Sequence, residues 1–158
     1  MSVELLCAIE SHNYAKICGI PRDFTFQHKL CHDFESLIWV IIYAMMIRRK
    51  STLAATNPIH HTAYKEYLDG YWGAHSHTKL LNSHMALMSA GMSPRRCIVD
   101  IVLFPDPLEA EFFRTAMRLL GPQRDGDAEP LTYEKVQTLF RTYIRKTEQA
   151  TRSTLAAT

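Results

Sequence analysis

The feature that most constrains the fold is a run of ten apolar residues, Ile38–Ile47, directly after the segment His32–Leu37. This run is too short to cross a bilayer, which needs roughly 20 apolar residues. Helices that are apolar on every side lie at the centre of larger helical bodies. We therefore predict a buried helix over about residues 33–48. Asp33 would lie at its N-terminus, where a carboxylate accepts backbone N–H groups and offsets the helix dipole.

Helical periodicity also dominates the rest of the chain. Further helices are predicted over Val3–Ser11, from a Ser76 cap to Gly91, from an Asp106 cap to Gly121–Pro122, and after Thr132. Residues 51–65 have few large apolar side chains and include Asn57–Pro58, so we expect an exposed loop there. The apolar residues of Cys97–Phe104 are nearly continuous and fit a strand or a buried helix. The pattern predicts a mainly α protein, with one domain over residues 1–148 and a short polar tail over 149–158.

The helix after Asp106 has the clearest signals of its beginning. Asp106 is a suitable N-cap and Pro107 occupies the first helical position. Glu109, three residues after the cap, is placed to complete a capping box.

Two segments carry a resemblance to a known family. The chain begins Met1-Ser2-Val3-Glu4-Leu5, and the apolar helix opens with His32-Asp33-Phe34-Glu35-Ser36. These resemble the fungal-type protein kinases, whose activation segment ends in Met-Ser-x-Glu-Leu and whose central C-lobe helix opens with His-Asp-Leu-Glu-Ser. Tyr71-Trp72, followed by Ala74 and Lys79, is similar to a further block of that family. The resemblance covers about residues 1–146, and Phe34 departs from it by replacing the family's Leu.

The resemblance implies the helical C-terminal lobe of a protein-kinase-like fold, with the N-terminal β lobe absent. The family's activity is ATP-dependent phosphorylation of Ser/Thr hydroxyls. The family's Gly-rich loop, ATP lysine, His-Arg-Asp loop and Asp-Phe-Gly motif all precede the Met-Ser-x-Glu-Leu element. We therefore expect a catalytically incomplete fragment with no catalytic, cofactor-binding or metal residues, and ATP and magnesium only in a full-length member. Asp23-Phe24-Thr25 lacks the required glycine.

Glu4 and Asp33 are the two residues to which the resemblance assigns architectural roles. In kinases the acid corresponding to Glu4 forms a buried pair with an arginine, for which Arg114, Arg118 and Arg124 are candidates. The acid corresponding to Asp33 holds the backbone of the catalytic loop. The plainer alternatives are an exposed helical glutamate at Glu4 and a simple N-cap aspartate at Asp33.

Other residues allow weaker hypotheses. His28 and His32 stand four apart, as in zinc-binding helices, but Lys29 occupies the position where a catalytic zinc site would carry a glutamate. Trp72, with Tyr67 and Tyr71, could form a recognition surface or anchor a loop onto the core. A hexapeptide, Ser-Thr-Leu-Ala-Ala-Thr, occurs identically at 51–56 and 153–158. Two copies are far too few for a repeat architecture.

Composition limits the partners and the location of the protein. The net charge of +2 gives no argument for nucleic acid or a membrane, so we expect neither as a partner. The first residues do not resemble a secretory signal, and the four cysteines show no Cys-x-x-Cys pair. We expect an intracellular protein, cytoplasmic or nuclear. Protein partners are expected through apolar lobe surface left exposed, and the alternative function is an all-α interaction module or pseudokinase remnant without enzymatic activity.

Overall fold

The computed structural model describes residues 2–20, 29–72, 76–92, 103–121 and 131–156. These residues form six α-helices and no strand, which confirms the predicted all-α class. The helices are α1 (Val3–Ile17), α2 (Leu30–Thr56), α3 (Pro58–Trp72), α4 (His77–Met92), α5 (Pro107–Leu120) and α6 (Tyr133–Ala156).

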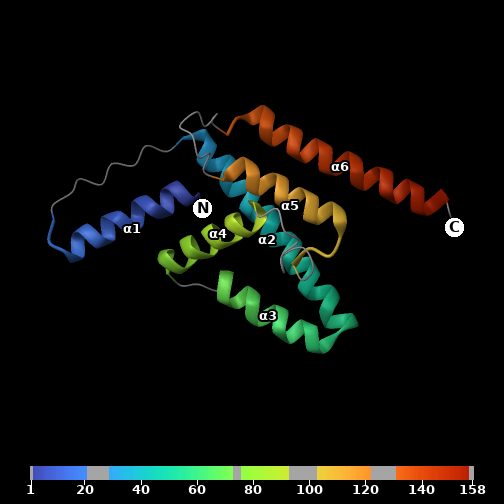
Figure 1. Ribbon diagram of the computed structural model, residues 1–158, viewed down its shortest axis with the longest axis horizontal. Coiled ribbons are helices and arrows are strands. Elements are labelled where there is room, and N and C mark those ends of the chain that lie inside the picture. The colour runs from blue at the N-terminus through green and yellow to red at the C-terminus, as the bar shows by residue number, and fades with distance from the viewer. Residues whose placement is uncertain (1, 21–28, 73–75, 93–102, 122–130, 157–158) are drawn as a thin grey trace.

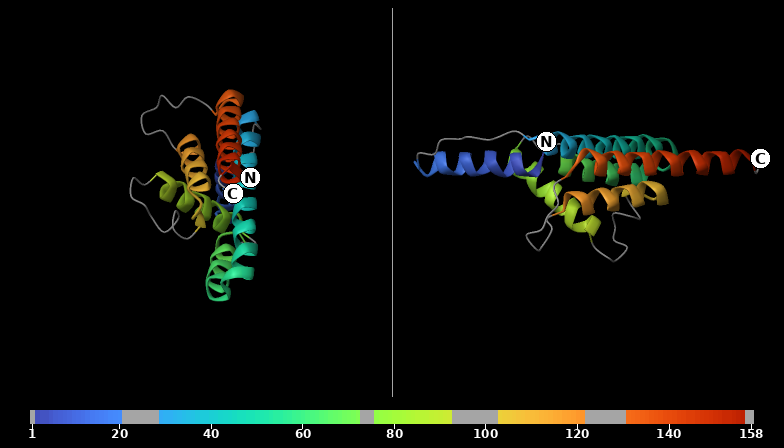
Figure 2. Two further views of the ribbon diagram at one scale, coloured as in Figure 1. Left: turned by 90° about the vertical axis from the view of Figure 1, so that its right-hand side faces the viewer. Right: turned by 90° about the horizontal axis from the view of Figure 1, so that it is seen from above.

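Helix α2 runs obliquely through the middle of the molecule, and the other helices are arranged around it (Figure 1). Helix α3 folds back against α2, and α4 packs on α1, α3 and α5. Helix α6 lies along α5, and its C-terminal end projects beyond the other helices (Figure 2). The main core therefore forms where α2 meets α3, α4, α5 and α6, and α2 contributes Ile38, Trp39, Ile42, Met45, Met46 and Leu53 to it.

The prediction of a helix buried on every side is wrong in part, because α2 buries one side of the predicted segment and exposes the other; at 27 residues it is also much longer than predicted. Among the described helices, it is the one long and apolar enough to cross a membrane by length and composition. The core helix of a soluble protein can have the same length and composition. One third of the residues in the most apolar stretch of α2 are buried within the fold. Leu37, Val40 and Tyr43 lie on its exposed side.

The prediction of an exposed loop over residues 51–65 is wrong. The hydroxyls of Ser51, Thr52 and Thr56 each donate to the carbonyl four residues earlier, which accommodates them within α2. Helix α3 then begins at once, because the Asn57 side chain accepts the His60 N–H at 3.2 Å and Pro58 takes the first helical position. Asn57–Pro58 is therefore a helix start.

The predicted caps of the later helices are confirmed. Ser76 accepts from the Lys79 N–H at 3.3 Å, Asp106 from the Leu108 N–H at 2.7 Å, and Thr132 from the Lys135 N–H at 3.4 Å. The predicted capping box at Asp106 differs, because the buried Glu109 carboxylate pairs instead with the Arg48 guanidinium of α2.

Two other predicted regions differ in outcome. Residues 149–156, predicted as a polar tail, continue helix α6 with exposed side chains. Cys97–Val102 lie outside the described residues, so the choice between strand and helix stays open there. Leu103 and Phe104 are buried in the core.

Candidate functional site

The two segments that carry the family resemblance lie against each other in the folded chain. The Val3 N–H donates to Glu35 Oε1 at 2.7 Å, and His32 Nε2 lies 2.8 Å from Glu4 Oε2. These contacts join positions 32 and 28 residues apart in the sequence. We call this region the motif junction and define it as Ser2, Val3, Glu4, Lys29, His32 and Glu35.

The local geometry of the motif junction follows from how both helices begin. The buried Ser2 caps α1 and accepts from the Leu5 N–H at 3.2 Å. At the start of α2, the Lys29 N–H donates to His32 Nδ1 at 3.0 Å. Because Nδ1 accepts this bond, a neutral His32 carries its hydrogen on Nε2 and donates it to Glu4. The junction therefore holds the start of α1 onto the start of α2.

The two carboxylates of the motif junction have opposite electrostatic environments. Burial raises the pKa of Glu35, although its Oε1 accepts from both the Val3 N–H and Trp39 Nε1. The hydrogen bond from His32 lowers the pKa of Glu4, with a further contribution from the positive charge of Lys29 at 3.4 Å. Glu4 therefore stays ionised more readily than Glu35.

The structure places the two predicted architectural residues close to the same helix start. Glu4 lies in the first turn of α1 with a half-exposed side chain, and its carboxylate contacts His32 and Lys29. This matches the plainer alternative for Glu4 better than a buried pair with arginine. Asp33 is exposed in the first turn of α2, whose N-cap position belongs to Lys29. The carboxylate of Asp33 is therefore placed to offset the helix dipole.

His32 and Glu35 are the junction residues whose roles the sequence reasoning did not identify. Both belong to the His-Asp-Phe-Glu-Ser segment, in which the sequence reasoning gave Asp33 an architectural role and His32 only a weak zinc-ligand hypothesis. A spacing signal existed: His32, Glu35 and Trp39 recur three and four residues apart and so share one face of the helix. The position of Glu35 one turn from the core ring of Trp39 was the sign that its carboxylate binds a partner inside the fold.

The zinc hypothesis gains no support from the described residues. His28 lies outside them, and His32 contacts Glu4 and the Lys29 amide. Within the described part of the chain, no group of three or more His, Cys, Asp or Glu side chains is placed to hold a metal ion.

The predicted aromatic cluster around Trp72 is built differently from the expectation. Trp72 ends helix α3 and packs against two rings of α2, with ring centroids 6.0 Å from Trp39 and 5.2 Å from Tyr43. His84 of α4 stacks on Trp39 at 3.9 Å with nearly parallel planes. The rings therefore join α2, α3 and α4, which is an anchoring role for Trp72. The side chain of Tyr71 lies outside the described residues.

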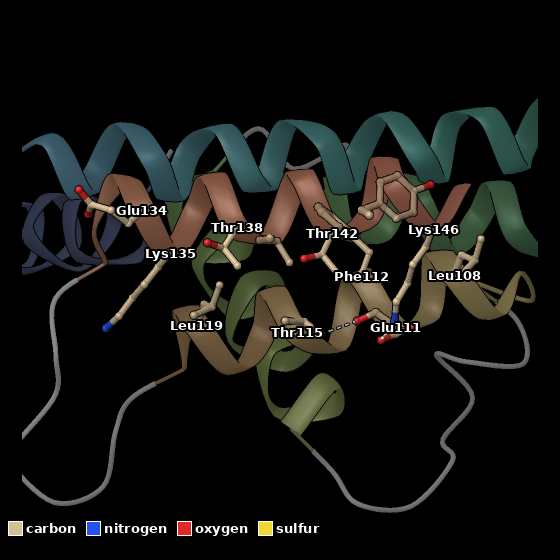
Figure 3. A pocket seen from close by; sticks show the side chains of 12 residues that line it. Leu108, Glu111, Phe112, Thr115, Leu119, Glu134, Lys135, Thr138, Thr142 and Lys146 are labelled. Atoms are coloured by element: carbon tan, nitrogen blue, oxygen red, sulfur yellow. Dashed lines mark hydrogen bonds and ion pairs between the residues drawn. The ribbon is translucent and has the colours of Figure 1, made fainter. Parts of the chain in front are cut away.

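An open apolar groove of about 350 Å³ lies between α5 and α6 (Figure 3). It is lined by Leu108, Glu111, Phe112, Thr115, Leu119, Glu134, Lys135, Thr138, Leu139, Thr142, Tyr143 and Lys146. Charged side chains lie at both ends, with Lys135 beside Leu119 at one end and the Lys146–Glu111 ion pair at the other. The middle of the groove is walled by apolar side chains and threonines from both helices.

The described residues contain an internal polar junction and an open apolar groove. Asp23-Phe24-Thr25, the segment most similar to a kinase metal-binding motif, lies outside them. Comparison with protein-family models, curated proteins and solved structures finds no match to this chain. The family resemblance therefore depends on the quoted motifs themselves.

Proposed function

We propose that residues 1–146 form the helical C-terminal lobe of a fungal-type protein kinase and do not transfer phosphate by themselves. The observation that carries the proposal is the motif junction. In the resembling family, the Met-Ser-x-Glu-Leu element ends the activation segment and the His-Asp-x-Glu-Ser element opens the central helix of the lobe. Direct bonds between these two elements, at Val3–Glu35 and Glu4–His32, support a shared architecture.

The lack of phosphoryl transfer follows from the chemistry that the reaction requires. Phosphoryl transfer depends on positioned cations, a phosphate-binding loop and a group that orients the attacking hydroxyl. The 158 residues contain no Gly-rich phosphate loop, His-Arg-Asp or Asp-Phe-Gly sequence. In this proposal the chain supplies the scaffold against which such elements pack.

Titration of Mg-ATP into the purified chain, followed by its thermal midpoint, tests this proposal. A ligand that binds the folded state stabilises it by about 2.7 kcal/mol at a hundredfold excess over its dissociation constant. At millimolar Mg-ATP we expect no saturable rise in the thermal midpoint beyond the rise that Mg-tripolyphosphate gives. Mg-tripolyphosphate is the control for general effects of anions. A saturable rise specific to ATP would contradict the proposal.

The coding sequence upstream of Met1 tests the kinase assignment independently. If the chain is a kinase lobe, that sequence should encode a His-Arg-Asp loop and an Asp-Phe-Gly-like element in the same reading frame. An upstream stop codon in the mature transcript would instead favour a separate module.

A second candidate function is an all-α module that binds a helix of a partner protein. The observation that favours it is the α5–α6 groove, whose floor along α5 from Leu108 to Leu119 extends about 16 Å, or three helical turns. A groove between two helices accommodates the apolar face of a third helix, and charges of both signs at its ends can pair with the partner's polar face.

A labelled amphipathic peptide with leucines at helical spacing provides a direct test of this second function. Saturable binding by fluorescence anisotropy is expected, with at least a tenfold loss in Thr138→Glu, because this change places a charge inside the groove. Thr151→Glu is the matched control, since Thr151 is exposed on the same helix outside the groove. Equal binding by both variants would exclude the groove as the binding surface.

A further inference from the structure

A smaller cavity of about 270 Å³ lies where α2, α3 and α4 meet. It is lined by Trp39, Val40, Tyr43, Trp72, Leu80 and His84. Four of these six residues carry rings, and Val40 and Tyr43 are exposed at the surface. The cavity is therefore open to solvent and has flat, largely apolar walls.

Polar atoms without partners occur in the wall of this cavity. His84 is 1% exposed, and both of its ring nitrogens are buried without a hydrogen-bond partner. The indole nitrogen of Trp72 is also buried and unpartnered, whereas that of Trp39 donates to Glu35. An unpaired buried polar group costs about 1–3 kcal/mol, and native proteins contain few of them. The three nitrogens therefore identify a place where an external partner would be favourable.

The lining also restricts the charge of such a partner. The residues that line the cavity include no carboxylate, lysine or arginine, so a charged ligand would be desolvated there without a counter-ion in direct contact. Burial lowers the pKa of His84 to about 3, so its imidazole is neutral near pH 7 and has one donor and one acceptor nitrogen. The site therefore favours an uncharged ring that carries one hydrogen-bonding group.

We propose that the cavity between α2, α3 and α4 binds a small uncharged aromatic molecule, whose hydroxyl or amide group hydrogen-bonds to His84. Its ring packs against the aromatic walls. Because the ring nitrogens are shielded from water in the free protein, binding includes a shift of the His84 ring relative to Trp39. This inference does not depend on the kinase resemblance or on the α5–α6 groove.

Intrinsic fluorescence gives a direct readout, because Trp39 and Trp72 are the two tryptophans of the chain and both line the cavity. Phenol is the test ligand, and toluene is the matched ligand without a hydroxyl. In both titrations the tryptophans are excited at a wavelength longer than the phenol absorption band, so that phenol itself does not absorb the exciting light. We expect phenol to bind the full chain saturably. Toluene is the more hydrophobic molecule, so the ratio of the phenol affinity to the toluene affinity should be clearly higher than the ratio of their partition coefficients into an apolar solvent.

The variant His84→Phe keeps a flat ring against Trp39 and removes both nitrogens. The phenol-over-toluene preference should fall by about tenfold in this variant, since the hydroxyl loses its partner. His77→Phe is the matched control on the same helix, where the side chain is exposed. It should leave both affinities unchanged.

Three outcomes would overturn the proposal. The first is phenol binding that never saturates, which is expected of general quenching. The second is an unchanged preference for phenol in His84→Phe, which would mean that the cavity is merely apolar. The third is loss of preference in His77→Phe as well. Because removal of an unpaired buried polar group is neutral or stabilising, His84→Phe should remain folded, and its thermal midpoint checks this.

Discussion

At the motif junction, single residues determine how the starts of α1 and α2 are held together. Glu35 Oε1 is the common acceptor for the Val3 N–H and the Trp39 indole, so one partly buried oxygen joins a chain segment to a core ring. Glu4 makes its bonds at the surface, where solvent weakens ion pairs. The partly buried carboxylate of Glu35 should therefore contribute more to stability than the exposed carboxylate of Glu4.

Replacement of Glu35 tests this directly. Glu35→Leu leaves two donors without an acceptor and should lower the free energy of unfolding by about 2–4 kcal/mol, while Glu35→Gln retains an acceptor oxygen and should cost much less. The raised pKa adds a pH dependence. The folded state favours the protonated acid, so this stabilisation is complete below the ordinary value of 4.5 and is lost as pH rises through the folded pKa.

Urea unfolding at several pH values measures this effect. Glu35→Gln should gain stability relative to the unmodified chain as pH rises above 4.5. Glu66→Gln, a change of an exposed glutamate on α3, is the control. A relative stability of Glu35→Gln that falls with rising pH would show that the carboxylate is preferred in its ionised form.

His84 should make the protein sensitive to acid. Its folded pKa of about 3 lies below the ordinary 6.5, so the unfolded chain binds the additional proton between these values. Stability should therefore fall as pH drops from 6.5 toward 3, by at most about 1.4 kcal/mol per pH unit from this group. Urea unfolding of His84→Phe should show a shallower slope in this range. A slope equal to that of His77→Phe would assign the acid sensitivity to other groups.

At the scale of elements, side-chain caps explain where the helices begin. Helix α5 has the most complete local signal, since Asp106 accepts from the N–H groups of Leu108 and Glu109 and Pro107 follows it. Helix α2 has no such side-chain acceptor from its cap residue, and the contacts of His32 hold its start instead. The start of α5 is therefore determined by residues next to it in the sequence, whereas the start of α2 depends on a distant segment.

The contribution of the α5 cap can be measured by substitution. Asp106→Ala should lower the free energy of unfolding by about 1 kcal/mol, because the first backbone N–H groups lose their acceptor. Asp106→Asn retains the acceptor oxygen and should recover most of this loss. Thermal or urea unfolding of both variants compares them. Equal losses would mean that the negative charge, rather than the hydrogen bond, is the stabilising feature.

At the scale of the whole molecule, the repeated hexapeptide shows how tertiary packing distinguishes identical local sequences. The first copy ends α2, where Leu53 is buried in the core. Most of the second copy ends α6, where the helix projects from the body and Leu155 is 71% exposed. The described residues of both copies are helical, and of the two leucines only Leu53 contributes to the core.

A pair of identical substitutions tests this difference. Leu53→Ala should lower the free energy of unfolding by about 2–5 kcal/mol, because it leaves a cavity in the core. Leu155→Ala should change it by less than about 0.5 kcal/mol, as is usual for exposed positions. Urea unfolding of both variants measures the contrast. Similar losses would indicate that α6 ends against another surface in solution.

The sequence by itself determined the helical class, the apolar character of α2, and the starts of α4, α5 and α6. These depend on periodicity and on caps within a few residues, which are local properties. Asn57–Pro58 was interpreted as part of a loop although its cap signal is also local, because residues 51–65 have few large apolar side chains. Here the cap chemistry was the better guide.

The tertiary structure decided which polar residues became partners. Glu109 pairs with Arg48 instead of capping its own helix, Glu4 hydrogen-bonds to His32, and Glu35 accepts the Val3 N–H. The cavity beside His84 likewise depends on three helices meeting. A single sequence does not contain such long-range choices in readable form, because they arise when packing of the apolar faces brings distant polar groups together and burial makes their pairing necessary.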